Sequence, residues 1–300
     1  MTNTEPIFFY DSEEKKVIHT AEVQRSESPI YSAQEGASYT KQLSKAERNN
    51  FNVIDKYRTT FLQQNPIIIF PQILSCTESD LCTMSSPPHF HQEGAFHHSV
   101  DEYETILSSF DQLRNTIDVS DLQHQSDPDE HDSIFTFLVS ILNDVEMYVA
   151  DRKKITDTLE STQNILIKVP ELPGHGDAHN QNWSIAQLNE KKVVSFIDLE
   201  TFGMYRVGWD EGRMYALLSG YLEDQQHLLQ AIEKKQHFDS YSECYFWRTA
   251  LIRSLRDIQL ISNGKRFTHL NEMQKTIKVQ EYLKTANQAL RELSHSPVLK

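Results

Sequence analysis

The 300-residue sequence has little glycine, little cysteine and no long apolar run. The sequence contains no run of 18 or more apolar residues, the length needed to span a bilayer. Its first residues lack the basic and apolar segments of a signal peptide. The three cysteines, Cys76, Cys82 and Cys244, form no CxxC pair. An odd number of cysteines without a secretion signal predicts reduced thiols in a cytoplasmic protein that makes no membrane contact.

Basic residues are also in deficit, since 29 lysines and arginines face 43 aspartates and glutamates, for a net charge of −14. Residues 101–160 alone carry 15 acidic and 4 basic side chains. Such a surface repels nucleic acid and attracts cationic small molecules. The alternative is a solvated acidic face that serves only solubility. The charge therefore argues against a nucleic-acid partner and gives weaker support to a cationic ligand.

The first third of the chain has strand patterns around one helix, and about two domains are expected for this length. Residues 17–24 and 30–43 predict strands, with a hairpin turn at 34–37. Ser44 and Glu47 form a capping-box pattern at the start of a helix over 44–63. The apolar run at 67–70, bounded by prolines, predicts a buried strand or extended segment.

The remainder of the chain is helical in pattern. Residues 85–98 contain paired prolines, a glycine and polar side chains, which is typical of a linker. Helical periodicity follows at 103–117, 133–150, 210–233, 239–262 and 270–293, with a charged loop at 120–132. We therefore expect an α+β protein with a small antiparallel-sheet lobe over 1–84, a hinge over 85–98 and a mostly helical lobe over 99–300.

Oxygen-bearing side chains gather in the segment 175–200. The loop HGDAHNQN at 175–182 contains Asp177 and Asn182, and the apolar strand VVSFI that follows leads into Asp198. Phosphoryl transfer needs positioning, charge neutralisation by Mg²⁺ and a carboxylate that accepts the hydroxyl proton. Because Mg²⁺ takes few, hard oxygen ligands, Asn182 and Asp198 suit the metal, and Asp177 can face an acceptor hydroxyl.

Two motifs in this segment resemble those of the aminoglycoside phosphotransferase and choline kinase-like family. HGDAHNQN resembles its HGDxxxxN catalytic loop, the counterpart of HRDxxxxN in protein kinases, and FIDLE resembles its IDxE segment. The resemblance implies a bilobal protein-kinase-like fold. It also implies transfer of the γ-phosphate of ATP, or of GTP, to a hydroxyl of a small molecule such as an amino sugar or amino alcohol, with Mg²⁺.

The resemblance assigns a role to each matched residue: Asp177 as catalytic base, His175 as a histidine that braces the loop, Asn182 and Asp198 as metal ligands, and Asp210 as a buried brace from the next helix. Glu200 is expected on the same side of a strand as Asp198, because side chains alternate. There it could bind a second metal, a water or the acceptor.

In the N-terminal part, the resemblance rests on order along the chain. Ser26 and Ser28 lie where a nucleotide-covering loop is expected, a loop that is glycine-rich in protein kinases but not here. Lys41 resembles the lysine that pairs with phosphates, Glu47 its ion-pair partner, and Met84 the start of the hinge against the adenine. The alternatives are a solvated lysine at position 41 and a purely capping role for Glu47.

Other functions fit parts of the pattern. A kinase-fold protein that binds nucleotide or a partner without turnover would share the loop but would not depend on Asp177. A metallophosphoesterase could use Asp177 and His179 in a GDxH motif, but no companion metal motif follows. The histidines within 89–98 lack the cysteine pair or HExxH context of a zinc site. The leading hypothesis is an ATP-dependent small-molecule kinase.

Overall fold

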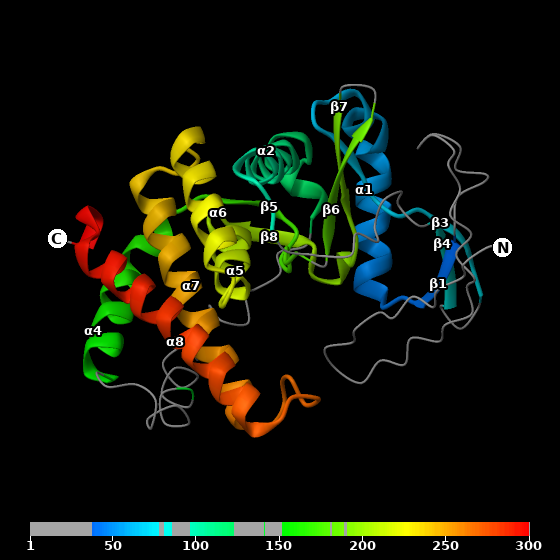
Figure 1. Cartoon of the computed structure of the whole chain (residues 1–300). Helices are drawn as coiled ribbons and strands as arrows, with labels where there is room; N and C mark the ends of the chain where they lie inside the picture. The colour runs from blue at the N-terminus through cyan, green and yellow to red at the C-terminus, as the bar shows by residue number, and fades with distance from the viewer. Residues whose placement is uncertain are drawn as a thin grey trace. The chain divides into compact units, whose positions relative to one another are not determined.

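The computed structural model describes residues 38–77, 81–85, 97–122, 141, 152–180, 182–188 and 191–299. These residues form two compact units, the first from those up to 85 together with 182–202, the second from 97–180 together with 203–299. The hairpin after residue 182 thus belongs to the first unit, although it follows helices of the second in the chain (Figure 1). Several predictions lie outside the described residues: Ser26, Ser28, the turn at 34–37, and most of 85–98, 120–132 and 133–150.

Two small sheets form the strand-rich part of the first unit. β1 (Ser38–Gln42) and β3 (Ile73–Cys76) both pair antiparallel with β4 (Leu81–Ser85), which is the small antiparallel sheet expected. In the second sheet, β6 (Trp183–Leu188) and β7 (Lys191–Phe196) form an antiparallel hairpin. β2 (Ile67–Ile69) runs parallel to β7, a pairing that the sequence does not indicate.

The helix of the first unit, α1 (Lys45–Gln63), confirms the helix predicted over 44–63. The Ser44 hydroxyl accepts the backbone N–H of Glu47 at 3.1 Å and so caps the first turn. The apolar face of α1 is buried and packs against β2. The rings of Phe61 and Phe70 lie 5.6 Å apart, and Phe70 stacks on Phe196 of β7 at 5.8 Å. These aromatic contacts join the helix to the hairpin.

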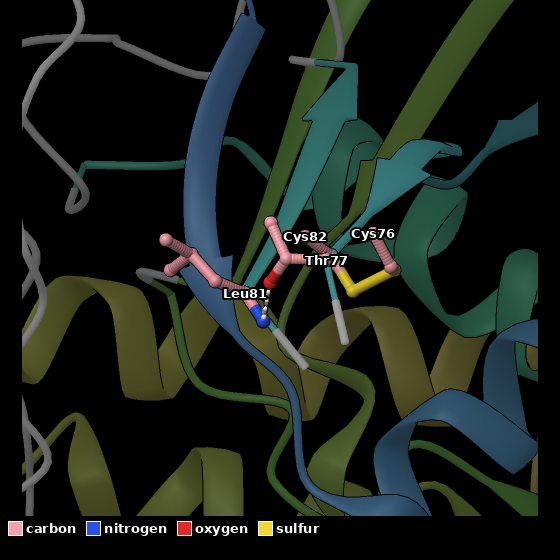
Figure 2. The surroundings of a disulfide bond; sticks show 4 residues. All are labelled: Cys76, Thr77, Leu81 and Cys82. Carbon is pink, nitrogen blue, oxygen red and sulfur yellow. Dashed lines mark hydrogen bonds between the residues drawn. A yellow bond between two sulfur atoms is a disulfide. The ribbon is translucent and has the colours of Figure 1, made fainter. Parts of the chain in front are cut away.

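Cys76 and Cys82 form a disulfide between β3 and β4, so the prediction of reduced thiols is wrong for this pair (Figure 2). The two residues are direct partners in the strand register. Just beyond them, Thr77 N–H donates to the Leu81 carbonyl at 3.0 Å, and Leu81 N–H donates to the Thr77 hydroxyl at 3.2 Å. The pairing was missed because it depends on strand register and has no short motif. Cys244 is free and buried.

The second unit is mostly helical. Its α-helices are α2 (Val100–Thr116), α4 (Arg152–Thr162), α5 (Trp209–Leu217), α6 (Leu222–Lys235), α7 (Ser240–Ser262) and α8 (Glu272–His295). Its strands β5 (Glu171–Gly174) and β8 (Gly203–Arg206) pair antiparallel. Helices α7 and α8 run side by side, and α7 also packs on α5 (Figure 1). Among the described residues, no helix combines the length and apolarity needed to cross a membrane.

The helical predictions hold for α2, α7 and α8, whereas the single helix predicted over 210–233 is wrong. The chain breaks there into α5 and α6. Gly220, between them, has φ +92°, a conformation that an L side chain rarely adopts. A Cβ at this position would also lie 2.4 Å from Oε2 of Glu281 on α8. Close approach to α8 therefore interrupts a continuous helical pattern.

Candidate functional site

The open end of the β6–β7 hairpin carries the predicted metal ligands. Asn182 directly precedes β6, and Asp198 is the second residue after β7. The Ile197 N–H donates to the Asn182 carbonyl at 2.9 Å, which extends the pairing past the strand ends. The hairpin therefore brings these two residues, 16 positions apart, to the same end of one sheet.

Asp198 begins a turn and does not continue the strand. Its φ is +55°, and Leu199–Thr201 forms a 3₁₀ turn. Glu200 therefore does not alternate along a strand with Asp198, which corrects the expectation that the two side chains share a strand face. Asn50 of α1 holds this turn, because its Nδ2 donates to the Leu199 carbonyl at 2.6 Å.

Lys41 joins two carboxylates in the first unit. Its Nζ lies 2.8 Å from Glu47 Oε1 and 2.8 Å from Asp198 Oδ1. Only Leu43 and Ser44 separate β1 from α1, so Lys41 and Glu47 can meet across a tight connection. Lys41 is not the solvated lysine of the alternative interpretation, and the Glu47 carboxylate does more than the capping pattern suggests.

Burial and charge oppose each other at this ion pair. Burial raises the pKa of Glu47, which is 2% exposed, while Lys41 opposes that rise. Burial lowers the pKa of Lys41, but Asp198 and Glu47 raise it above its usual value, so the side chain stays a cation. The Glu200 carboxylate also raises the pKa of Glu47. One cation among three carboxylates leaves an excess of negative charge.

The donor set at the hairpin end fits Mg²⁺. Asn182 and Asp198 offer amide and carboxylate oxygens, and Mg²⁺ in proteins takes few such ligands and completes its shell with water and phosphate oxygens. In the part of the chain that the structure describes, no group of three or more His, Cys, Asp or Glu side chains could hold a metal.

In the second unit, Asp210 holds the loop that starts at His175. Its Oδ2 accepts the His175 N–H at 2.9 Å and its Oδ1 accepts the Gly176 N–H at 2.8 Å. Asp210 lies in the first turn of α5 and is 1% exposed. Gly174 leaves room for this contact, since a Cβ there would lie 2.7 Å from Oδ2 of Asp210. One carboxylate thereby holds two successive backbone N–H groups of the loop.

Asp177, in the same loop, is one quarter exposed and forms an ion pair with Arg213 of α5. His179 Nε2 lies 3.8 Å from Asp177 Oδ2. Burial by itself raises the pKa of Asp177, but Arg213, His179 and Arg253 lower it to about 2. Burial lowers the pKa of His179 to about 4 despite the Asp177 charge. At neutral pH, Asp177 is therefore a carboxylate and His179 is neutral.

Met84 lies in β4, opposite Tyr39 of β1 and Ile73 of β3, and its side chain is fully buried. A hinge contact with an adenine at this position would therefore come from backbone groups.

Comparison with known proteins gives matches to solved structures, whereas no family model and no curated sequence matches the chain. A microcompartment-associated aminopropanol kinase has 10% identity and a TM-score of 0.59, over 93% of this chain and 95% of that one. A choline/ethanolamine kinase family protein from Mesorhizobium loti has 13% identity and a TM-score of 0.55, over 98% and 89%. A spectinomycin phosphotransferase, in complex with ADP and spectinomycin, has 11% identity and a TM-score of 0.52, over 85% and 87%.

The chain has the fold of the aminoglycoside phosphotransferase and choline kinase-like proteins. The α+β, protein-kinase-like fold implied by the two motifs is thereby confirmed. One fold serves many substrates, so the acceptor does not follow from it.

Two residues near the kinase-like motifs were missed by the sequence analysis. Arg213 follows Asp210 by three positions, so a helix that starts at 209 brings both to the same loop. The spacing of three residues from Asp210 could have indicated that Arg213 lies near this loop. Asn50 contacts the turn after Asp198 across 149 positions, and nothing local in the sequence indicates that contact.

Proposed function

We propose that this protein is an ATP-dependent kinase that phosphorylates a hydroxyl of a small molecule, with GTP as the alternative donor. The observation that carries the proposal is the contact of Lys41 with both Glu47 and Asp198, at 2.8 Å each. Lys41 and Asp198 are 157 positions apart, and Asp198 belongs to the IDxE-like segment. Active protein kinases need a lysine–glutamate ion pair and a metal-binding aspartate in place together. Lys41 and Glu47 resemble the pair, and Asp198 resembles the aspartate.

The remaining residues have roles that suit this reaction. Mg²⁺, held by Asn182 and Asp198, would offset the charge of the β- and γ-phosphates when bound. The acceptor oxygen forms a bond to the γ-phosphorus, the bond from that phosphorus to the bridging oxygen breaks, ADP leaves, and the hydroxyl proton passes to Asp177. Asp177 follows the braced His175–Gly176 backbone, which supports a fixed orientation of its carboxylate.

The solved structures support a small hydroxyl-bearing acceptor and a nucleotide donor. One of them is an aminopropanol kinase, and another was solved with ADP and spectinomycin. Amino alcohols and amino sugars are therefore the reference acceptors for an assay.

A pair of variants tests the proposal. Asp198→Ala should abolish the rise in melting temperature that Mg-ATP produces. Asp177→Asn should keep that rise but lower ADP release with a suitable acceptor about 10²–10⁴-fold, the usual range for loss of a general base. Asp55→Asn, which removes a half-exposed carboxylate paired with Arg58 on α1, is the control and should change neither. No stabilisation of the wild type by Mg-ATP or Mg-GTP would refute the proposal.

A second candidate is a nucleotide-binding protein without turnover. The ion pair of Asp177 with Arg213 favours it, because a carboxylate of low pKa is a poor proton acceptor. Nucleotide stabilisation without any Asp177-dependent ADP release would identify this function.

A further inference from the structure

The charges nearest to Asp177 are basic, although the chain as a whole is acidic. Apart from burial, the groups with the largest effect on the pKa of this carboxylate are four basic residues: Arg213, His179, Arg253 and His175. Arg213 contacts it directly and also lies over the Trp209 ring, 5.6 Å from the ring centre. An acceptor that approaches Asp177 therefore meets guanidinium groups.

Arg253, one of these basic residues, also belongs to a second ion-pair group centred on Asp257. Arg253 Nε is 3.3 Å from Asp257 Oδ2, and Arg266 is 2.6 Å from Asp257 Oδ1. Asp257 is fully buried, while the two arginine side chains are 19% and 26% exposed. One carboxylate is thus shared by two cations that remain partly accessible.

Helix packing explains why these arginines converge. Gly212 lets α5 approach α7, because a Cβ there would lie 2.6 Å from the Phe246 carbonyl and 2.8 Å from Thr249 Cβ. Arg213 is the next residue on α5, and Arg253 is one turn after Thr249 on α7. The close contact of the two helices places both arginines toward the same loop.

We define the cationic cluster as Arg213, Arg253 and Arg266 with Asp177 and Asp257. Its three guanidinium groups and two carboxylates leave one positive charge. His179 adds none at neutral pH, because burial lowers its pKa to about 4. An ammonium group would add to this charge in a partly buried place, whereas an anionic group would offset it.

We infer that the phosphate acceptor is an anion, a small hydroxylated carboxylic acid or phosphate monoester whose charged group is bound by Arg253 and Arg213. Guanidinium groups suit both anions because they donate two parallel hydrogen bonds to carboxylate or phosphate oxygens. This inference rests on the proposed function and departs from the cationic acceptor that the acidic segment 101–160 favoured. An anion bound to Arg213 would also weaken the effect of this arginine on Asp177. The Asp177 carboxylate would then be more basic and a better proton acceptor.

A matched set of three-carbon alcohols tests the charge of the acceptor. Glycerate, glycerol 3-phosphate, glycerol and 3-amino-1,2-propanediol differ mainly in one group, which is a carboxylate, a phosphate, neutral or an ammonium. Binding to the full chain is measured by calorimetry with Mg-ADP present. We expect at least one of the two anions to bind tenfold or more tightly than the amine, and the tighter anion identifies the class.

Variants show whether the cluster causes the preference. Arg253→Gln should reduce anion binding about tenfold or more and, where turnover is seen, raise KM with little change in kcat. Asp257 keeps Arg266 in this variant, which protects the fold. Arg291→Gln removes the same charge from an exposed site on α8 and should leave the preference intact.

Several outcomes would overturn the inference: tighter binding of the amine, equal or absent binding of all four compounds, or an anion preference that persists in Arg253→Gln. The proposed function is tested separately, because Mg-ATP stabilisation and its loss in Asp198→Ala do not depend on the acceptor.

Discussion

The two units hold their candidate functional carboxylates in opposite charge settings. In the first unit, a single cation, Lys41, is shared by Glu47 and Asp198. In the second unit, a single carboxylate, Asp257, is shared by two arginines, while Asp177 is paired with a third. An excess of carboxylate suits a divalent cation, and an excess of guanidinium suits an anion. Asp177 and Asp198 therefore differ in their chemistry because their ion-pair partners differ.

Among the variants that test this comparison, the largest effect is expected from removing Lys41, the cation shared by Glu47 and Asp198. Lys41→Met should lower kcat/KM about 10²–10³-fold, the usual cost of losing one preorganised charge. The variant also removes the lysine that pairs with Glu47, a carboxylate that is only 2% exposed. Steady-state ADP release measures the effect, and Lys45→Met, an exposed lysine four residues on, is the matched control. Equal activity of the two variants would remove Lys41 from the mechanism.

The brace of the Asp177 loop comes next. Asp210→Ala leaves two buried backbone N–H groups without their carboxylate, which should cost about 1–3 kcal/mol for each unsatisfied group. Because misplacement by about 1 Å can cost 10²-fold in rate, kcat should also fall by about that factor. Urea unfolding and kcat are compared with Asp239→Ala, which removes the N-cap of α7 and should cost about 1 kcal/mol. A normal kcat in both variants would make Asp210 purely structural.

The ion pair of the basic setting predicts a pH dependence. The folded pKa of Asp177 lies below its ordinary value of 3.8, at about 2, so its stabilisation is complete above pH 4 and disappears as the pH falls through about 2. The contribution is about 2 kcal/mol, since one pKa unit is about 1.4 kcal/mol.

Arg213→Met should raise the pKa of Asp177, because burial then opposes ionisation with less compensation. The acid loss of melting temperature between pH 6 and 2 should therefore begin at higher pH than in the wild type, and carboxyl NMR titration of Asp177 should show the same direction. An unchanged titration of Asp177 would mean that Arg213 does not control it.

The smallest effect is expected from the disulfide of the first unit. Cys76→Ser removes a cross-link between residues six positions apart, and so short a loop should contribute about 2 kcal/mol to stability, at the low end of the typical range for disulfides. Denaturant unfolding with and without a reductant measures it. The wild type should resemble the variant under reducing conditions. A stability difference that persists under reduction would point to packing of the Cys76 side chain and not to the cross-link.

Much of the local structure could be predicted because it depends on neighbours a few residues away. The Ser44 cap, the apolar face of α1 and the long helices α7 and α8 follow from residue type and spacing. The break at Gly220 could not be predicted, since it depends on Glu281 of another helix. The turn at Asp198 was also missed, because the residues that follow read as a continuing strand and Asn50 fixes their geometry from α1.

The fold class could be predicted from the sequence, and so could the loop and the strand end that carry Asp177, Asn182 and Asp198, because the motifs are contiguous. The charges around these residues depend on contacts between distant parts of the chain. Lys41 reaches Asp198 across 157 positions, and Arg213 and Arg253 reach the Asp177 loop from two helices. The net charge of −14 favoured a cationic acceptor, which is the opposite of what these arginines favour. Electrostatic energy depends on distance and burial, so a few arginines close to Asp177 outweigh many distant, solvated carboxylates.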